Sequence, residues 1–394
     1  MNRSLAAAAR VPGERADSKG AFSRKVPALD GIRGLAIIWV VFHNTTDLPY
    51  SHPAPVFHAA TVLTQMGWIG VELFFALSGF LITAGLLQTQ GAPHYFRNFY
   101  AKRALRILPL YYTVLFVLLV LLPRAVTLPP PFSNAHQASL WLFFSNWTPA
   151  VPYGFAHFWA LAVEVQFYLF WPLVVCWLPA RRLLTVCVWT AVGALLLRSV
   201  MAGHGADWWT LYATTPCRMD VLALGGAGAC VMRLPTLRQW IQTRLTAINV
   251  AALLLFLMGA ILTHAYNRGT WIGATVGYTV LALCSAAFVT GVVLSERGEG
   301  ARIKSVLAWT PLRSCGRYSY AMYVFHGLLH KLVGEPWLNA RFGEHPPFPT
   351  VLVYAVGVLA ITYLLAFCSY HMLEKHFLNL KRLLEPVSRP ARHR

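Results

Sequence analysis

The chain is poor in charged side chains, and acidic ones are the scarcest. Of its 394 residues only 12% are charged, and 14 are Asp or Glu, whereas 57% are hydrophobic. This composition excludes an ordinary soluble globular domain. We find no internal repeat and no stretch with the composition of a soluble domain. The sequence therefore predicts a protein embedded in a lipid bilayer.

Signals for several functional classes are also missing. The seven cysteines are scattered, mostly in apolar stretches, without a CxxC pair or a Cys/His metal-ligand spacing, so we expect them to pack in the core and predict no metal site. No Gly-x-Ser-x-Gly elbow supports a serine acyl-enzyme. The first 30 residues lack the apolar core of a signal peptide. No basic-aromatic module is present, so nucleic acid is not expected as a partner.

Long apolar runs are what the chain does contain. Runs of about 17–25 residues are long enough to cross the roughly 30 Å of bilayer hydrocarbon. We predict an all-α fold, a polytopic membrane helical bundle of about ten transmembrane helices. The predicted spans are 33–48, 68–90, 107–123, 158–178, 183–202, 218–234, 246–264, 271–294, 316–333 and 350–373.

The basic residues are distributed unevenly along this topology. The formal net charge is +19, and with ten spans 27 of the 33 Lys and Arg fall on the side of the termini. Such a bias places both termini in the cytoplasm of a multi-pass protein of the inner (cytoplasmic) membrane. We divide the chain into a disordered cytoplasmic lead (1–28), a membrane domain (29–377) and a basic cytoplasmic tail (378–394).

His43 is the first candidate for chemistry. It lies near the end of the apolar run Leu35-Ala-Ile-Ile-Trp-Val-Val-Phe-His43, where an ionisable side chain is costly unless it is paired or faces a polar cavity. Asp47 follows one helical turn later and shares its face. A base and a carboxylate within reach of each other indicate chemistry inside the membrane.

The other carboxylates near predicted spans allow two interpretations each. Glu164, in an aromatic helix, is either a structural pair or an acid/base or acceptor-binding group. Glu72, beside small residues that let helices approach closely, is either an interhelical hydrogen-bond partner or catalytic. Asp220 is expected to pair with a group on another helix, because Arg218, two positions away, points elsewhere.

Two arginines and a second histidine complete the candidates. Arg103 and Arg106 are three residues apart and share a helical face at the cytoplasmic membrane surface. They either set topology and contact lipid headgroups or bind an anionic cofactor, since arginine forks match phosphate oxygens. His326, late in the ninth predicted span, is typical of a buried packing residue.

Taken in order, these segments resemble the acyltransferase-3 family of integral membrane acyltransferases, from about residue 29 to 377. The matching motifs are Leu29-Asp30-Gly31-Ile-Arg33-Gly34 with His43, Gly70-Val-Glu72 through Ser78-Gly79-Phe80, Arg103-Ala-Leu-Arg106-Ile-Leu-Pro109, His157-Phe-Trp159 through Glu164-Val-Gln166 and Trp171-Pro172, Gly316 through His326, and Tyr370-His-Met-Leu-Glu374.

The resemblance implies transfer of an acyl group, commonly acetyl from acetyl-CoA, to a hydroxyl. Acceptors in the family include surface polysaccharides, peptidoglycan, glycolipids and macrolide-type metabolites. It makes His43 the family's first-helix histidine, Arg103 and Arg106 its cytoplasmic basic motif, and Glu164 its helix-four carboxylate. Val165 stands where a second glutamate is common, which argues against a carboxylate pair. We expect a stand-alone enzyme without a fused SGNH domain.

The resulting hypothesis assigns a role to each candidate. His43 is the base, oriented by Asp47, with Glu164 as the third catalytic group. Arg33, Arg103 and Arg106 bind acyl-CoA, the donor co-substrate. Asp30, Glu72, Asp220 and His326 line or brace the cavity. The expected partners are acyl-CoA, a hydroxyl-bearing carbohydrate or glycoside acceptor and membrane lipid; no metal is expected. A transporter or flippase of a polysaccharide or small molecule, or a glycosyltransferase using a lipid-linked sugar, is the alternative.

Overall fold

The computed structural model describes residues 26–50, 54–122, 133–149, 151, 154–295 and 298–384, and over these ranges the chain is helical without a strand. The all-α prediction is confirmed. The predicted disordered lead and basic tail fall largely in 1–25 and 385–394, outside the described residues. The longer helices are α2 (Pro27–Thr46), α4 (Ile69–Thr89), α5 (Tyr95–Phe116), α8 (Trp159–Trp177), α9 (Ala180–Gly203), α11 (Thr215–Val231), α13 (Leu245–Leu262), α14 (Tyr278–Leu294), α16 (Thr310–Leu329) and α18 (Phe348–Ser369).

Each of the ten predicted spans falls on one of these helices. Among the described residues, seven helices are long and apolar enough to cross a membrane, or eight if the bent pair formed by Trp208–Val231 and Pro235–Thr243 is one span. The two others, α2 and α16, are 20 residues long but carry more polar side chains. At 1.5 Å per residue, 20 residues span about 30 Å. The protein is a polytopic membrane helical bundle; ten crossings stay a prediction.

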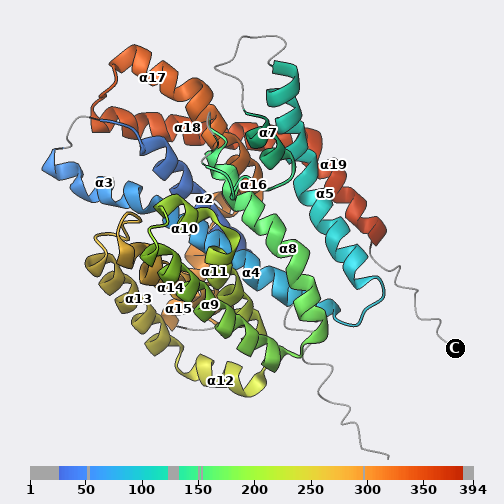
Figure 1. Ribbon diagram of the computed structural model, residues 1–394. Helices are drawn as coiled ribbons and strands as arrows, with labels where there is room; N and C mark the ends of the chain where they lie inside the picture. Colours follow the sequence, from blue (N-terminus) through green and yellow to red (C-terminus); the bar gives the residue numbers. More distant parts are fainter. Residues whose placement is uncertain are drawn as a thin grey trace, which may run out of the picture.

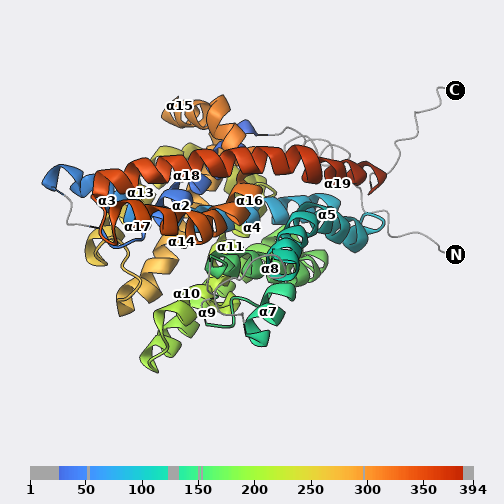
Figure 2. The same cartoon turned by 90° about the horizontal axis from the view of Figure 1, so that it is seen from above.

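The polar helices α2 and α16 lie in the middle of the bundle. Figure 1 shows α2, α4 and α16 between two groups of helices, α9, α11, α13 and α14 on one side and α5, α8 and α19 (Lys375–Asn379) on the other. Figure 2 shows α18 and α19 running as one long rod along an edge, past α2 and α16. The apolar helices thus surround the polar pair and shield it from lipid.

Two glycines bring α2 and α16 into backbone contact. A Cβ added to Gly316 would overlap the carbonyl oxygen of Asp30, and one added to Gly34 would overlap that of Leu312. Small residues at such crossings let membrane helices approach closely. This contact fixes the position of Arg33, which directly precedes Gly34 in the chain.

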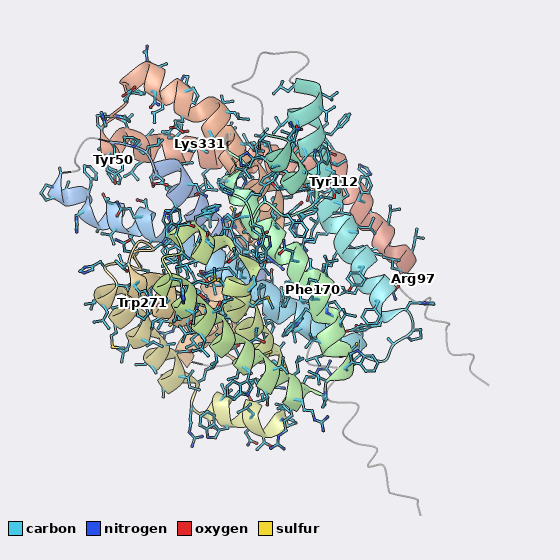
Figure 3. The ribbon with its side chains drawn as sticks, viewed as in Figure 1. Tyr50, Arg97, Tyr112, Phe170, Trp271 and Lys331 are labelled. Atoms are coloured by element: carbon cyan, nitrogen blue, oxygen red, sulfur yellow. The ribbon has the colours of Figure 1, made fainter. Side chains whose placement is uncertain are left out.

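The short helices gather at the ends of the long ones. They are α3 (His58–Gln65), α7 (Asn134–Trp141), α10 (Trp208–Ala213), α12 (Pro235–Thr243), α15 (Gly298–Leu307) and α17 (Glu335–Phe342). Figure 3 shows Arg97, at the start of α5, at one end of the bundle and Lys331 and Tyr50 near the opposite end. A ligand that passes from the Arg97 end to the Lys331 end would therefore traverse the bundle.

Candidate active site

A basic groove of about 570 Å³ lies where α5 begins. Its described lining contains no carboxylate, and the C-terminal end of the described chain contributes a lysine beside the arginines of α5. The cationic lining residues are Arg97, Lys102, Arg103, Arg106 and Lys381. This concentration of positive charge suits a ligand with several negative charges.

A second, narrower cavity of about 80 Å³ continues inward from the groove. We call it the arginine cavity, because it shares Arg103 and Arg106 with the groove and adds Arg33 from α2. Its other polar lining residues are Ser78, Glu164, Tyr168, Ser319, Tyr320 and Tyr323. Four helices (α2, α4, α5 and α8) and the central α16 therefore contribute to one polar passage.

The side chains of the arginine cavity are held by defined contacts. The Arg33 guanidinium pairs with Asp30 at 3.1 Å. The Arg103 guanidinium lies 5.4 Å from the centre of the Tyr168 ring and 5.7 Å from that of Phe99, which restricts its rotamers. Glu164 accepts a hydrogen bond from the hydroxyl of Ser78 on α4. Arg33, Arg103 and Glu164, which the sequence assigned to the site, thus line the same cavity.

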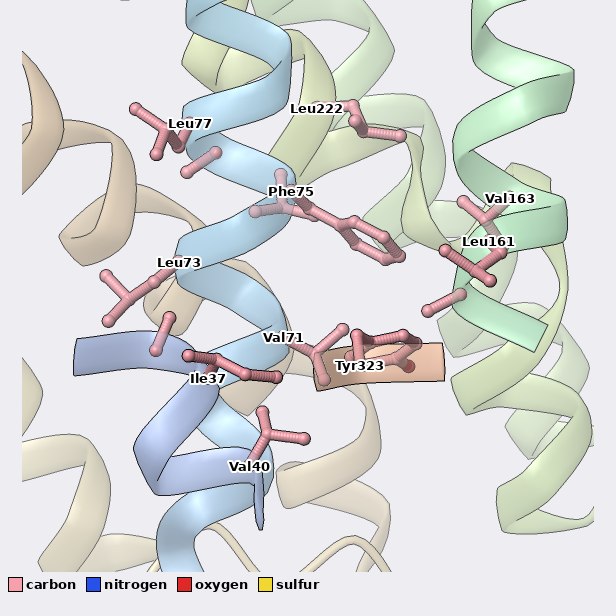
Figure 4. Packing of buried hydrophobic residues seen from close by; sticks show 14 of the residues in the cluster. Ile37, Val40, Val71, Leu73, Phe75, Leu77, Leu161, Val163, Leu222 and Tyr323 are labelled. Carbon is pink, nitrogen blue, oxygen red and sulfur yellow. The ribbon is translucent and has the colours of Figure 1, made fainter. Parts of the chain in front are cut away.

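A third cavity, of about 210 Å³, contains His43 and Asp47. It shares Val71 and Tyr323 with the arginine cavity, and Figure 4 shows these two side chains next to each other between α4 and α16. The remaining lining is mostly aromatic and basic; it includes Trp68, His157, Trp159, Trp208, Trp209, Tyr212, Arg268, His330 and Lys331. The groove and both cavities therefore form a series in which each member shares two lining residues with the next.

The hydrogen bond made by His43 defines which of its two ring nitrogens carries the proton. The side chain is 8% exposed, and Nδ1 lies 3.1 Å from the carbonyl oxygen of Thr64. Because a carbonyl oxygen only accepts, Nδ1 carries the proton and Nε2 keeps a lone pair. Among the described residues Asp47 forms no hydrogen bond or ion pair with the ring, although it lines the same cavity. Its predicted orienting role therefore stays a prediction.

A second histidine braces the helix that carries His43. His326 Nδ1 donates to the Tyr323 carbonyl oxygen at 2.7 Å, so its Nε2 accepts from Asn44 Nδ2 at 2.8 Å. The ring of His157 lies 4.6 Å from that of His326, centroid to centroid. The Tyr323 hydroxyl in turn donates to the His157 carbonyl oxygen at 2.8 Å. These contacts link α2, α16 and the helical turn Ala156–Phe158, which precedes α8, around the junction of the two cavities.

The short helix α10 supplies part of the aromatic wall of the His43 cavity. Asp207 caps its start and accepts from the Thr210 backbone N–H at 3.0 Å and from the Thr210 hydroxyl at 2.5 Å. These bonds, chiefly the one from the hydroxyl, lower the pKa of the Asp207 carboxyl because they favour its charged form. The cap thereby fixes where Trp208 enters the cavity wall.

Glu72 and Asp220 lie outside the described linings of all three spaces and form buried ion pairs instead. Glu72 on α4 pairs with Arg218 on α11, and both side chains are fully buried. Asp220 pairs with Arg198 on α9 at 2.7 Å, so its partner lies on another helix, as the spacing predicts. These contacts favour the structural interpretation of both carboxylates.

Sequence reasoning missed several residues of the site. Tyr323, at the junction of the two cavities, and Arg268, in the His43 cavity, received no role. Thr64 acts through its carbonyl oxygen, so its side chain gave no signal. Arg198, in contrast, could have been identified from the sequence. An arginine within the predicted span 183–202 is as costly in the membrane as the histidine in α2.

Over the described residues the chain is a helical membrane bundle in which a basic groove and the arginine cavity lead to the cavity that contains His43. A family model described as an acyltransferase domain matches residues 26–367, nearly the whole chain. The chain belongs to the acyltransferase-3 family, which confirms the resemblance found in the motifs.

Proteins similar to this chain include O-acetyltransferases of bacteria. A putative peptidoglycan O-acetyltransferase, YrhL of Bacillus subtilis, is 26% identical over 388 residues, which cover 89% of this chain and 55% of that protein. O-acetyltransferase OatA of Staphylococcus aureus is 26% identical over 387 residues, 89% of this chain and 57% of OatA. Peptidoglycan O-acetyltransferase OatA of Listeria monocytogenes is 25% identical over 335 residues, 77% of this chain and 49% of that protein. The chain thus spans about half the length of these relatives. No solved structure matches it.

Proposed function

We propose that the protein is an integral membrane O-acetyltransferase that moves an acetyl group from acetyl-CoA to a hydroxyl of a carbohydrate. The observation that carries this proposal is the series formed by the basic groove, the arginine cavity and the cavity that contains His43. Membership of the acyltransferase-3 family and the O-acetyltransferase relatives support it.

The donor fits the first two spaces by charge and shape. The phosphates of acetyl-CoA would lie in the basic groove, where Arg103 and Arg106 present guanidinium groups suited to phosphate oxygens. The thin pantetheine arm would enter the arginine cavity beside Arg33. Glu164 lines the arginine cavity and not the His43 cavity, so we assign it a binding role in place of the catalytic one expected from the sequence. It would accept hydrogen bonds from the amide N–H groups of that arm, so that the thioester reaches Tyr323 at the junction.

His43 would be the general base for the acceptor hydroxyl. Its Nε2 takes the hydroxyl proton while the hydroxyl oxygen attacks the thioester carbonyl carbon. The C–S bond then breaks, the new ester leaves on the acceptor, and the proton passes from the imidazolium to the CoA thiolate. Asp47, in the same cavity, would orient the ring of His43. Direct transfer of this kind requires no acyl-enzyme.

The location of the acceptor follows from the proposed topology. With both termini in the cytoplasm, the basic groove faces the cytoplasmic acetyl-CoA pool, and the His43 cavity lies toward the outer side of the inner membrane. Arg33 and His43 are ten residues apart on α2, about 15 Å of helix rise. The aromatic lining suits sugar rings, whose C–H faces pack on aromatic rings. An envelope glycan, such as the peptidoglycan named for two of the relatives, is the acceptor that this arrangement favours.

Replacing both groove arginines tests donor binding. In the R103Q/R106Q protein we expect KM for acetyl-CoA to rise about 10- to 100-fold, because charge-assisted hydrogen bonds to phosphate are lost. The measurement is acetyl-CoA-dependent thiol release by the purified full chain in detergent micelles. The matched control is R181Q/R182Q. It removes two arginines at the start of α9, which are not among the described lining residues of the groove. An unchanged KM for acetyl-CoA in R103Q/R106Q would contradict the donor assignment.

A further inference from the structure

Arg268 enters the His43 cavity from the loop that joins α13 to α14. The guanidinium carbon lies 5.3 Å from the Trp68 ring centre, 5.0 Å from that of Trp208 and 5.0 Å from that of Tyr212. Three aromatic rings thus hold one cation in place. They offer no full negative charge, so the positive charge at the cavity wall is not neutralised by them.

The loop that presents Arg268 has an unusual backbone. His264, Ala265 and Tyr266 have φ values of 49°, 60° and 59°, three consecutive non-glycine residues in the left-handed region. L-residues rarely adopt this region, and such conformations persist only where the surroundings enforce them. The Tyr266 side chain is fully buried, and its hydroxyl donates to the Phe256 carbonyl oxygen at 2.8 Å.

Side-chain hydrogen bonds hold the rest of this turn. The Thr263 hydroxyl accepts from the Tyr266 backbone N–H at 2.9 Å, and Asn267 Oδ1 accepts from the Gly269 N–H at 2.9 Å. Arg268 therefore projects from a braced loop rather than from a loose one. Strained and braced backbone next to a cavity is typical of a functional position.

Among the described residues Arg268 has no ion-pair partner, although charged groups share its cavity. Asp47 lines the cavity but forms no ion pair with it, and the other cation, Lys331, is paired with Glu335 at 2.6 Å. The cavity thus contains one cation without a carboxylate partner, beside the histidine that would activate the acceptor. A single guanidinium fork matches a singly charged carboxylate in a bidentate geometry.

We propose that Arg268 binds a carboxylate carried by the acceptor and so selects acidic sugars and places their hydroxyl at His43. This inference rests on the proposed O-acetyltransferase function and names the acceptor class for the same site. Arg268 would act as a specificity residue: it contacts the acceptor and takes no part in the bonds that form and break.

The test compares an acidic sugar with its neutral ester on the full chain in detergent micelles. The probes are methyl β-D-glucuronide and its methyl ester, which have the same hydroxyls and differ by one negative charge. Binding is read from tryptophan fluorescence, because Trp68 and Trp208 flank the guanidinium. In wild type we expect half-saturation by the acid at a concentration at least about tenfold lower than by the ester, the factor of one charge-assisted hydrogen bond.

Three variants assign this difference to Arg268. R268Q should bind the two sugars equally, whereas R268K, which keeps the charge without the fork, should retain part of the preference and serves if R268Q does not fold. R244Q is the matched control: Arg244 also stacks on a tryptophan, Trp240, at 4.8 Å, outside the described lining of the cavity. It should keep the full preference.

Two results would overturn the inference. One is equal or absent binding of acid and ester in wild type. The other is an undiminished preference for the acid in R268Q or, if R268Q does not fold, in R268K. Acetyl-CoA turnover, measured in the same preparations, separates this failure from that of the proposed function. Turnover without a carboxylate preference refutes the role of Arg268 alone. Absence of acetyl-CoA turnover in the wild-type protein refutes the O-acetyltransferase proposal.

Discussion

The His43→Ala protein is expected to transfer acetyl groups about 10²- to 10⁴-fold more slowly than wild type, the range by which a positioned general base accelerates a reaction. The reason is local: Nδ1 of His43 donates to Thr64, so Nε2 has the lone pair that accepts the hydroxyl proton. Binding of acetyl-CoA should be unaffected, because His43 lies outside the groove and the arginine cavity. The measurement is single-turnover transfer from labelled acetyl-CoA, with CoA binding measured in parallel.

A second histidine provides the control for this loss. His204 is exposed at the end of α9, with Nδ1 2.8 Å from the Val200 carbonyl oxygen, and it lines none of the three spaces as described. The His204→Ala protein should transfer acetyl groups at the wild-type rate. Full transfer by a folded His43→Ala protein would remove His43 from the mechanism.

The Arg218→Leu protein should be less stable than wild type by about 3–5 kcal/mol, the cost of leaving one partner of a buried ion pair alone. Glu72 would keep a charge in a fully buried position without the guanidinium that pairs with it. The ring of Tyr278, 4.9 Å from the guanidinium carbon, would also lose its cation. The measurement is the free energy of unfolding in one fixed detergent mixture.

A double variant separates charge from packing in this pair. In E72L/R218L neither charge is left, and replacing a buried ion pair by apolar side chains is often close to neutral. The double variant should therefore recover most of the stability lost in Arg218→Leu. If it is no more stable than the single variant, packing around Arg218, and not the unpaired carboxylate, is what the substitution disrupts.

The helices were predictable because the length of each apolar run can be read from the sequence. All ten predicted spans fall on helices, since backbone polar groups in lipid must be satisfied within the segment. Boundaries were less accurate: α2 begins at Pro27, six residues before the predicted span, because Asp30 and Arg33 pair with each other within its first turns. Spacing also predicted that Arg103 and Arg106 share one face, and both line the groove.

The parts of the site that depend on distant segments were not predictable. Glu72 and Arg218 are 146 residues apart, and nothing local to either indicates the other. Val71 and Tyr323 line the same two cavities because the fold brings part of α4 close to α16, where the ring of Phe74 lies 6.3 Å from that of Tyr323. His43 donates its hydrogen bond to the backbone carbonyl oxygen of Thr64. A backbone acceptor has no residue-type signature, so the sequence pointed to Asp47 instead. Arg268 depends on a turn whose left-handed residues are not glycines.

The most direct test of the central claim is the stoichiometry of acetyl-CoA consumption and acceptor acetylation by the purified full chain in proteoliposomes. Peptidoglycan fragments offered on the side of the His43 cavity and acetyl-CoA on the side of the basic groove should give one acetyl ester for each CoA thiol released, and neither product in the R103Q/R106Q protein at low acetyl-CoA. Movement of a sugar across the membrane without consumption of thioester would contradict the account and indicate a transporter.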